Sequence, residues 1–399
     1  MGFAFRMLIG IVGKTNVGKS TFFKALTLAE VEISARPFTT IKPNHGIAYV
    51  RVSCPCKEFG VRCNPKNSFC IDGNRFAPVE VLDVAGLVPG AHEGRGLGNK
   101  FLDDLRQADC FIHIIDISGT TDENGRETKG YDPSKDIRFI EEEIDLWLYS
   151  ILKRNWAKLT RVVSIKGEEF EKSLANQLSG LGIKFEHVVK ARKESGLMDK
   201  NPLFWNDEEL LKFASNLRRI SKPMIIAANK VDLPSAEENL RKVKEEFKGY
   251  EIIPCCAEAE LALRQAARRG IVKYIPGDGD FEILKASPEQ KKALDFIRER
   301  VLKKFGSTGV QETINKAVLE ILGCVVVFPV EDENKLTDKD GNVLPDAFVM
   351  PKGSTALDLA LKVHTELGEK FIKAIECRSK KFVGRDYTLK NLDVIKIFT

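Results

Sequence analysis

The sequence predicts an α/β fold with a mostly parallel sheet, a helical insertion and a C-terminal α+β domain. Over roughly the first 255 residues, short apolar runs alternate with helical stretches, as in chains where helices connect parallel strands. More than a hundred residues separate two of these runs, whereas one crossover needs about a dozen residues. After residue 324 the pattern becomes rich in short strands, which indicates a separate module.

Six apolar runs are typical of buried strands, because they are short, continuous and bounded by polar or glycine residues. They are Met7–Gly13, Gly46–Val52, Val79–Asp83, Cys110–Asp116, Met224–Ala228 and Glu251–Cys255. A helix is expected over Lys19–Ala29, directly after the first run and its glycine-rich turn.

The long interval between the fourth and fifth runs predicts a small helical hairpin or bundle. Isoleucine and leucine recur at helical spacing from Ile137 to Ile151, and further helical stretches follow near residues 170–178, 185–192 and 207–220. We therefore expect a discontinuous α/β domain at residues 1–133 and 222–323, a helical insertion at 134–221 and a C-terminal domain at 324–399. In the last part, strands are expected at Cys324–Val330 and Phe348–Met350, with one helix over Thr355–Leu367.

Composition limits the classes of partner. The formal net charge of +5 is small for 399 residues, so the sequence does not favour a sequence-specific DNA-binding protein. No apolar run reaches the roughly 18 residues of a membrane helix. The N-terminal run continues directly into a phosphate-binding motif and is not typical of a signal peptide. We expect a cytoplasmic protein with reduced thiols.

The motif that follows the first strand is a phosphate-binding loop. Residues 13–20 read Gly-Lys-Thr-Asn-Val-Gly-Lys-Ser, which matches this loop at every defined position. Its glycines let main-chain N–H groups surround a phosphate at the start of a helix. Lys19 is expected to bridge the β- and γ-phosphates, and Ser20 to bind Mg²⁺. The expected nucleotide-binding residues here are Gly13, Lys14, Thr15, Asn16, Val17, Gly18, Lys19, Ser20 and Thr21.

The third strand ends in a second nucleotide motif. Asp83 is followed by Val-Ala-Gly, and an aspartate in this position can hold a water molecule of Mg²⁺. The N–H group of Gly86 can contact the γ-phosphate, so this segment is expected to respond to hydrolysis.

The fifth strand ends in a base-selecting motif, Asn229-Lys230-Val231-Asp232. A carboxylate on Asp232 can accept hydrogen bonds from the N1–H and exocyclic amine of guanine, and adenine lacks this pair of donors. Asn229 and the stem of Lys230 would support the pocket. After the sixth strand, the main chain at Cys256 and Ala257 could meet guanine O6. These motifs predict a P-loop GTPase domain that binds GTP and GDP.

Three long stretches resemble the Obg family of GTPases, in its YchF-related branch. They run from Gly10 to Ser20, from Arg36 to Gly46 and from Asp83 to Leu102. The resemblance implies that the C-terminal part is a TGS domain of β-grasp fold, with residues 384–397 at its closing strand. It also implies a ribosome or another RNA-containing complex as partner. Proteins of the YchF branch itself lack the Asn-Lys-x-Asp motif and prefer ATP, so this chain resembles an archaeal or fungal subgroup that retains it.

The resemblance also bears on the metal and on catalysis. A threonine between the first helix and second strand should sense the γ-phosphate; spacing leaves Thr39 and Thr40 open, and the resemblance implies Thr40 as the Mg²⁺ ligand. Leu87 stands where Ras-like enzymes have a water-orienting glutamine, so intrinsic hydrolysis should be slow. The resemblance implies Asn16 as a K⁺ ligand. The expected catalytic set is Lys19, Thr40, Gly86 and Asn16, with His92 a weaker candidate that is more often a solvated loop residue.

Four of the nine cysteines cluster in one turn-rich stretch between the second and third strands. Cys54, Cys56, Cys63 and Cys70 suit tetrahedral Zn²⁺, although their spacing is not that of paired Cys-x-x-Cys knuckles. A disulfide and free thiols are the alternatives.

The leading hypothesis is a GTP-binding switch with slow hydrolysis that a cation or partner stimulates, acting with the translation machinery. The alternatives are a guanine-nucleotide sensor that does not hydrolyse and a metabolic phosphotransferase. The C-terminal part carries as many Lys and Arg as Asp and Glu, which does not favour RNA binding by charge alone.

Overall fold

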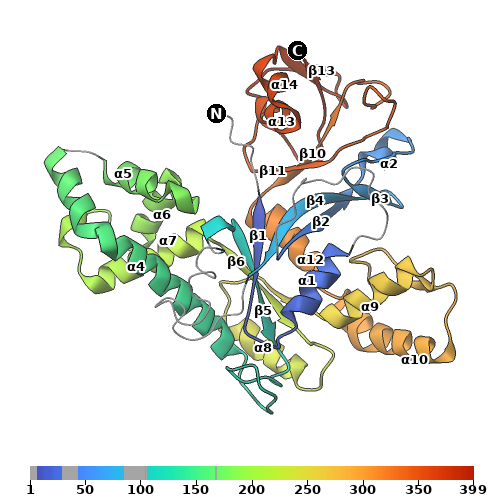
Figure 1. Ribbon diagram of the computed structural model, residues 1–399, viewed down its shortest axis with the longest axis horizontal. Helices are drawn as coiled ribbons and strands as arrows, with labels where there is room; N and C mark the ends of the chain where they lie inside the picture. The colour runs from blue at the N-terminus through green and yellow to red at the C-terminus, as the bar shows by residue number, and fades with distance from the viewer. Residues whose placement is uncertain (1–6, 29–43, 85–103, 105, 167–168) are drawn as a thin grey trace. The chain divides into compact units, whose positions relative to one another are not determined.

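The computed structural model describes residues 7–28, 44–84, 104, 106–166 and 169–399 (Figure 1). The expectations for Thr39, Thr40, Gly86, Leu87 and His92 lie outside these residues.

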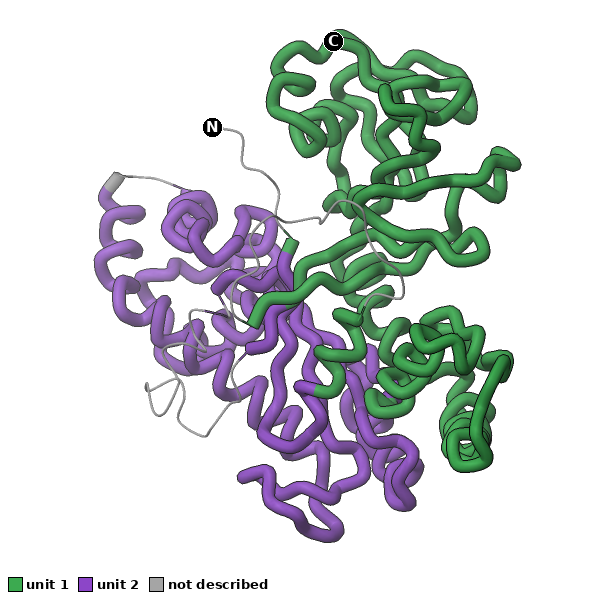
Figure 2. Tube along the Cα trace, turned by 45° about the vertical axis from the view of Figure 1, so that its right-hand side comes forward, with its two compact units in different colours: residues 1–7, 21–81, 256–399 green, residues 8–20, 82–255 purple. Residues whose placement is uncertain are grey.

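The chain forms two compact units, which Figure 2 shows in different colours. The first unit comprises residues 1–7, 21–81 and 256–399, and the second unit comprises residues 8–20 and 82–255. Each unit is described separately below.

The second unit is built on a parallel sheet. Its strands are β1 (Leu8–Val12), β5 (Cys110–Asp116), β6 (Met224–Asn229) and β7 (Ile252–Pro254), and each pairs in parallel with the next. Almost all residues of these strands are buried, which explains their apolar sequences. The predicted strands therefore form with nearly the predicted bounds. Helix α8 (Ala236–Glu246) follows β6.

A group of helices connects β5 to β6 in this unit, as the sequence predicts (Figure 1). They are α4 (Ser134–Lys166), α5 (Phe170–Gln177), η2 (Ser179–Leu181), α6 (Phe185–Glu194), η3 (Pro202–Phe204) and α7 (Asp207–Ser221). An aromatic cluster forms part of their core, with the rings of Trp156 and Trp205 5.3 Å apart and those of Trp205 and Phe213 5.1 Å apart. Asn206 and Glu209 form a capping box that begins α7.

The first unit contains the remaining strands and helices of the predicted α/β domain. Before residue 84 these are α1 (Lys19–Thr27), which begins in the second unit, then β2 (His45–Ser53), α2 (Pro55–Phe59), β3 (Phe69–Ile71) and β4 (Asn74–Asp83). After residue 256 they are α9 (Ala257–Arg268), β8 (Val272–Lys273), β9 (Glu282–Ile283), α10 (Pro288–Ile297), η4 (Arg298–Leu302), α11 (Lys303–Phe305), α12 (Val310–Asn315) and η5 (Lys316–Ile321). Ser287 caps α10, with its hydroxyl accepting a hydrogen bond from the main-chain N–H group of Gln290.

The C-terminal part of the first unit has a five-stranded sheet of its own, in the order β11-β10-β14-β12-β13. Its elements are β10 (Val325–Val330), β11 (Phe348–Met350), α13 (Ala356–Val363), α14 (Thr365–Glu369), β12 (Lys373–Glu376), β13 (Lys381–Val383) and β14 (Val394–Phe398). Strands β10 and β14 pair in parallel and the others are antiparallel. We call this part, residues 324–399, the C-terminal module.

One expectation in this module is wrong. The single helix expected over Thr355–Leu367 is two helices, because the backbone of His364 is extended, with φ −161° and ψ 138°. The imidazole of His364 then accepts a hydrogen bond from the N–H group of Glu366 and begins α14.

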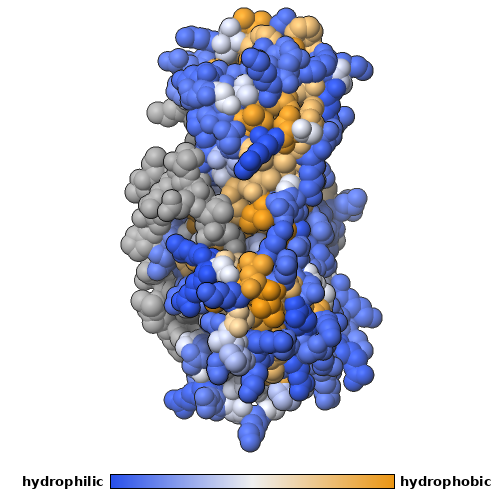
Figure 3. Space-filling model, turned by 90° about the vertical axis from the view of Figure 1, so that its right-hand side faces the viewer, coloured by the Kyte–Doolittle hydropathy of each residue, from blue (hydrophilic) through white to orange (hydrophobic). Residues whose placement is uncertain are grey.

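The surface is largely polar on the face drawn in Figure 3, where apolar residues gather in smaller patches between hydrophilic ones. Such a mixture is ordinary for a folded domain. Within the described residues, no helix combines the length and the apolar character needed to cross a membrane.

Candidate nucleotide-binding site

The loop after β1 contains two glycines that no larger residue could replace without displacement. A Cβ atom at Gly13 would lie 2.6 Å from the carbonyl oxygen of Ile114, and one at Gly18 would lie 2.2 Å from Nδ2 of Asn229. Gly18 also has φ +93°, a conformation that favours glycine. The loop therefore lies against the ends of β5 and β6, as close as its glycines allow.

Asn229 connects the base-selecting motif to the phosphate loop. It ends β6, is almost fully buried, and donates from Nδ2 to the carbonyl oxygen of Val17 at 2.8 Å. This bond joins residues that are 212 positions apart in the chain. The structure therefore brings together two motifs that the sequence predicted separately.

Lys19 is the first residue of α1, and its side chain lies beside Asp83, the last residue of β4. Its Nζ donates to the carbonyl oxygen of Val84 at 2.5 Å and lies 3.6 Å from Oδ1 of Asp83. Burial lowers the pKa of Lys19, and the charge of Asp83 partly opposes this. Oδ1 of Asp83 is buried, and among the described residues its nearest cation is the ammonium group of Lys19, so this oxygen can still act as an acceptor beside the loop. An oxygen of this kind, together with the hydroxyl of Ser20 at the start of α1, fits the hard oxygen ligands that Mg²⁺ prefers.

The side chain of Lys14 is buried and forms its contacts within the protein. Its Nζ donates to the carbonyl oxygen of Thr121 at 2.9 Å, pairs with Asp136 at 2.9 Å and lies 3.9 Å from the ring centre of Tyr131. Only 4% of Lys14 is exposed. Lys14 can therefore contribute its main-chain N–H group to a phosphate site, whereas its ammonium group holds the loop to residues 121–136.

Asn16 has a left-handed backbone, with φ +65°, which asparagine tolerates better than most residues. Its Nδ2 donates to the carbonyl oxygen of Gly125 at 2.8 Å. This bond uses one half of the amide and leaves the amide oxygen as a separate acceptor.

Lys230 and Asp116 form a pair that the sequence analysis missed. Nζ of Lys230 lies 2.9 Å from Oδ2 of Asp116, whose carboxylate also accepts from Ser118 and Thr121. Burial would raise the pKa of Asp116, but hydrogen bonds from Ser118 and Lys230 outweigh it, so the pKa is lowered. The stem of Lys230 is thereby fixed at the end of β6. The position of Asp116 at the carboxyl end of a buried strand was the available signal.

The roles of the remaining expected site residues stay predictions. Thr40 and Gly86 lie outside the described residues. Cys256 and Ala257 belong to the first unit, where they begin α9, and the N–H group of Cys256 donates to the carbonyl oxygen of Thr308 at 2.9 Å. Asp232 is half-buried in the turn after β6.

A phosphate-binding loop on a parallel sheet, with an Asn-Lys-x-Asp motif at the end of β6, defines a P-loop GTPase. Three family models match the chain. The Obg-like GTPase YGR210-like, G4 motif-containing domain matches residues 227–332, the 50S ribosome-binding GTPase matches residues 8–152, and the TGS domain matches residues 337–399.

The chain belongs to the Obg-like GTPase family, together with YchF-related proteins. A GTP-binding protein of Methanocaldococcus jannaschii is 58% identical over 393 residues, which is 98% of both chains. A GTP-binding protein of Schizosaccharomyces pombe is 38% identical over 363 residues, or 88% of both. Among solved structures, a GTP-binding protein from Pyrococcus horikoshii OT3 has 42% identity and a TM-score of 0.77, covering 98% of this chain and 100% of that one.

Proposed function

We propose that this chain is a guanine-nucleotide switch that binds Mg²⁺–GTP at the phosphate loop, hydrolyses it slowly and acts with the translation machinery. The observation that carries the proposal is the hydrogen bond from Asn229 to Val17, because it joins base selection to phosphate binding. Division into a GTPase domain, a helical insertion at 134–221 and a C-terminal domain at 324–399 is part of the same proposal.

The choice of base depends on Asp232. Relatives differ on this point: the Bacillus subtilis protein, 29% identical over 413 residues and 97% of both chains, is named a ribosome-binding ATPase, YchF. In this chain the Asn-Lys-x-Asp motif is complete, and Asn229 and Lys230 are both held in position by hydrogen bonds. An adenine would leave the carboxylate of Asp232 without its two donors, and this supports a preference for GTP.

For the phosphates, the proposal assigns Lys19 to the β- and γ-phosphates and Ser20, Thr40 and Asp83 to Mg²⁺. When bound, Mg²⁺ neutralises charge on the phosphate oxygens. The main-chain N–H groups of residues 13–21 would bind the β-phosphate at the start of α1.

Slow hydrolysis follows from the lack of a water-orienting group at Leu87. We propose that K⁺, held in part by the amide oxygen of Asn16, raises the rate by adding positive charge where negative charge develops. The bond from Nδ2 of Asn16 to Gly125 supports this assignment, because it would fix the orientation of the amide. A purely structural role for Asn16 is the competing explanation.

A ribosomal partner is supported by the B. subtilis relative, which is named a ribosome-binding ATPase, and by the match to the 50S ribosome-binding GTPase model. The C-terminal module has no net charge, so such binding would depend on shape and specific contacts more than on overall attraction.

Nucleotide competition tests the proposal. Wild-type protein should bind GTP about 5- to 150-fold more tightly than ATP, since an acceptor that the bound base buries without donating to it costs about 1–3 kcal/mol. Asp232→Asn should shift the preference towards xanthosine triphosphate, whereas Asp207→Asn, an exposed carboxylate on α7, should not. Equal affinity of the wild type for GTP and ATP would contradict the assignment.

Turnover separates the alternatives. Phosphate release from GTP in K⁺ buffer, with and without ribosomes, is expected without any second substrate. A sensor would release no phosphate under either condition, and a phosphotransferase would require an acceptor molecule.

A further inference from the structure

The strongest group outside the nucleotide site is formed by the four cysteines of residues 54–70 in the first unit. Their four Sγ atoms all lie within 4.8 Å of one another. Sγ of Cys54 lies 3.9 Å from Sγ of Cys63, and Sγ of Cys56 lies 4.0 Å from Sγ of Cys70. We propose that these four sulfurs bind one Zn²⁺ as a tetrathiolate site, and that this ion holds the loop to which the C-terminal module is bonded.

The sulfur separations fit zinc and do not fit disulfides. With Zn–S bonds of about 2.3 Å in a tetrahedron, the sulfurs lie about 3.8 Å apart. A disulfide requires a sulfur–sulfur distance of about 2.05 Å, so the sulfurs of either pair would have to approach by nearly 2 Å to form one. The nine cysteines all lie within the described residues and form no disulfide, and the five outside this cluster are buried.

Three successive elements bring the sulfurs together. Cys54 directly follows β2, and Cys56 lies in α2, which ends at Gly60 with φ +62°. Cys70 lies in β3, which pairs with β4 through a two-residue turn at Asp72 and Gly73. Both turn residues have positive φ, as a tight hairpin requires. The unusual cysteine spacing is therefore explained by a short helix and a hairpin in place of two knuckles.

Burial of the cluster is graded. Cys54 and Cys56 are 1% and 7% exposed, whereas Cys63 and Cys70 are partly exposed. A metal ion could therefore reach the site from the side of Cys63 and Cys70 and be enclosed on the other side.

A buried cation lies next to the sulfurs. Arg75 is fully buried, and its Nη2 lies 3.5 Å from Sγ of Cys54. Four thiolates around Zn²⁺ carry a net charge of −2, and a neighbouring guanidinium reduces the cost of burying this charge. The same guanidinium donates to the carbonyl oxygen of Leu344 at 3.0 Å, which connects the cluster to the C-terminal module.

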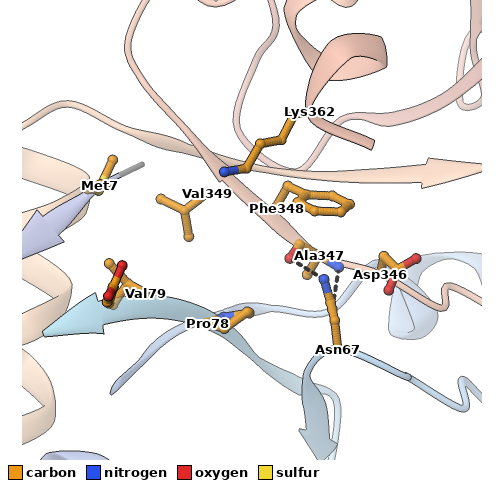
Figure 4. A pocket seen from close by; sticks show the side chains of 10 residues that line it. Met7, Asn67, Pro78, Val79, Asp346, Ala347, Phe348, Val349 and Lys362 are labelled. Carbon is orange, nitrogen blue, oxygen red and sulfur yellow. Dashed lines mark hydrogen bonds between the residues drawn. The ribbon is translucent and has the colours of Figure 1, made fainter. Parts of the chain in front are cut away.

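The segment between the third and fourth ligands forms further bonds to that module. The N–H groups of Asn64 and Lys66 donate to the carbonyl oxygens of Val343 and Pro345, at 3.1 and 2.7 Å. The amide of Asn67 exchanges two hydrogen bonds with the main chain of Ala347, at 3.2 and 3.0 Å (Figure 4). These bonds require residues 63–70 to keep one conformation, which two metal bonds at Cys63 and Cys70 would impose.

Within the part of the chain that the structure describes, side chains leave a space beside these bonds. A cavity of about 210 Å³ lies next to Asn67 and Ala347, lined among others by Val79 of β4 and by Phe348 and Val349 of β11 (Figure 4). Among the described residues, apolar side chains leave this space open, so we expect the hydrogen bonds from residues 64–67 to carry part of the attachment. Loss of the metal should therefore loosen the module at residues 338–347.

Metal analysis of the full chain, purified with a reductant, tests the first half of the proposal. We expect one zinc per chain, and Co²⁺ in its place should give the absorption bands of a tetrahedral cobalt–thiolate site. Absence of both zinc and cobalt binding would overturn the proposal. Disulfides that join Cys54 to Cys63 and Cys56 to Cys70, found by mass spectrometry of peptides from the unreduced protein, would also overturn the proposal.

Hydrogen exchange tests the second half. Cys63→Ser changes a partly exposed ligand and should reduce zinc content and speed exchange at residues 338–347, while GDP affinity stays within twofold. Cys324→Ser, the same change at a buried cysteine outside the cluster, should keep the zinc. Where Cys63→Ser fails to fold, chelation of the wild-type protein gives the same readout. Unchanged exchange after the zinc is removed would refute the role in holding the module.

Discussion

The contact between Gly18 and Asn229 allows a quantitative test of how the phosphate loop is held. Asn229→Ala removes the donor to the carbonyl oxygen of Val17. Gly18→Ala introduces a methyl group 2.2 Å from Nδ2 of Asn229 and should displace the same side chain. Both substitutions therefore break one hydrogen bond from opposite sides.

The expected size of each effect follows from burial. A buried acceptor left without a donor costs about 1–3 kcal/mol, which weakens GDP binding by about 5- to 150-fold if the bonded loop is the binding conformation. Gly18→Ala adds backbone strain at φ +93°, on the order of 1–2 kcal/mol. The double variant should lose less than the sum of the single variants, because the shared bond can be broken only once.

Fluorescent GDP titration of the wild type, both single variants and the double variant measures this cycle. Gly130→Ala is the matched control, because Gly130 also has positive φ, +75°, but has open space around its Cβ position. It should bind GDP like the wild type. Additive losses in the double variant, or an equal loss in Gly130→Ala, would refute the reasoning.

Three further predictions concern other groups of the second unit. Lys19→Ala should abolish Mg²⁺-dependent GTP binding while the circular dichroism spectrum stays native; an unfolded spectrum would instead indicate a structural role. Replacing K⁺ by Na⁺ should slow single-turnover GTP hydrolysis by the wild type. Asn16→Ala should remove this difference between the two ions while keeping much of the GDP affinity. Identical wild-type rates in KCl and NaCl would contradict the cation assignment. Burial lowers the pKa of Lys222 to about 8, with Asp109 opposing. The unfolded chain therefore binds more protons between about pH 8 and 10, so this lysine makes folding stability rise with pH in that window, by up to about 3 kcal/mol. Urea unfolding at both ends of the window measures the free energy of unfolding, which should rise less with pH in Lys222→Met than in the wild type. An equal rise in the wild type and the variant would exclude Lys222 as its source.

Much of the fold could be predicted because its strands are buried on both faces. Runs such as Cys110–Asp116 and Met224–Asn229 are buried throughout and mostly apolar, and their bounds agree with the predicted ones to within a residue. Short elements carried no such signal: β3 has three residues, and α2 begins with a proline between two cysteines. The break at His364 was also missed, since helical periodicity continues across it.

The sequence alone determined the chemistry offered by this protein: the phosphate loop at residues 13–20, the aspartate that ends β4, the base-selecting motif at 229–232 and four clustered cysteines. These signals are local, because each depends on neighbours a few positions away. Only the tertiary structure decided which side chains meet. It directs the ammonium group of Lys14 towards Asp136, bonds Asn229 to Val17, and brings the sulfurs of Cys54 and Cys70 within 4.8 Å of each other. The physical reason is that such contacts depend on how strands and turns pack in three dimensions, and distance along the chain does not determine distance in space.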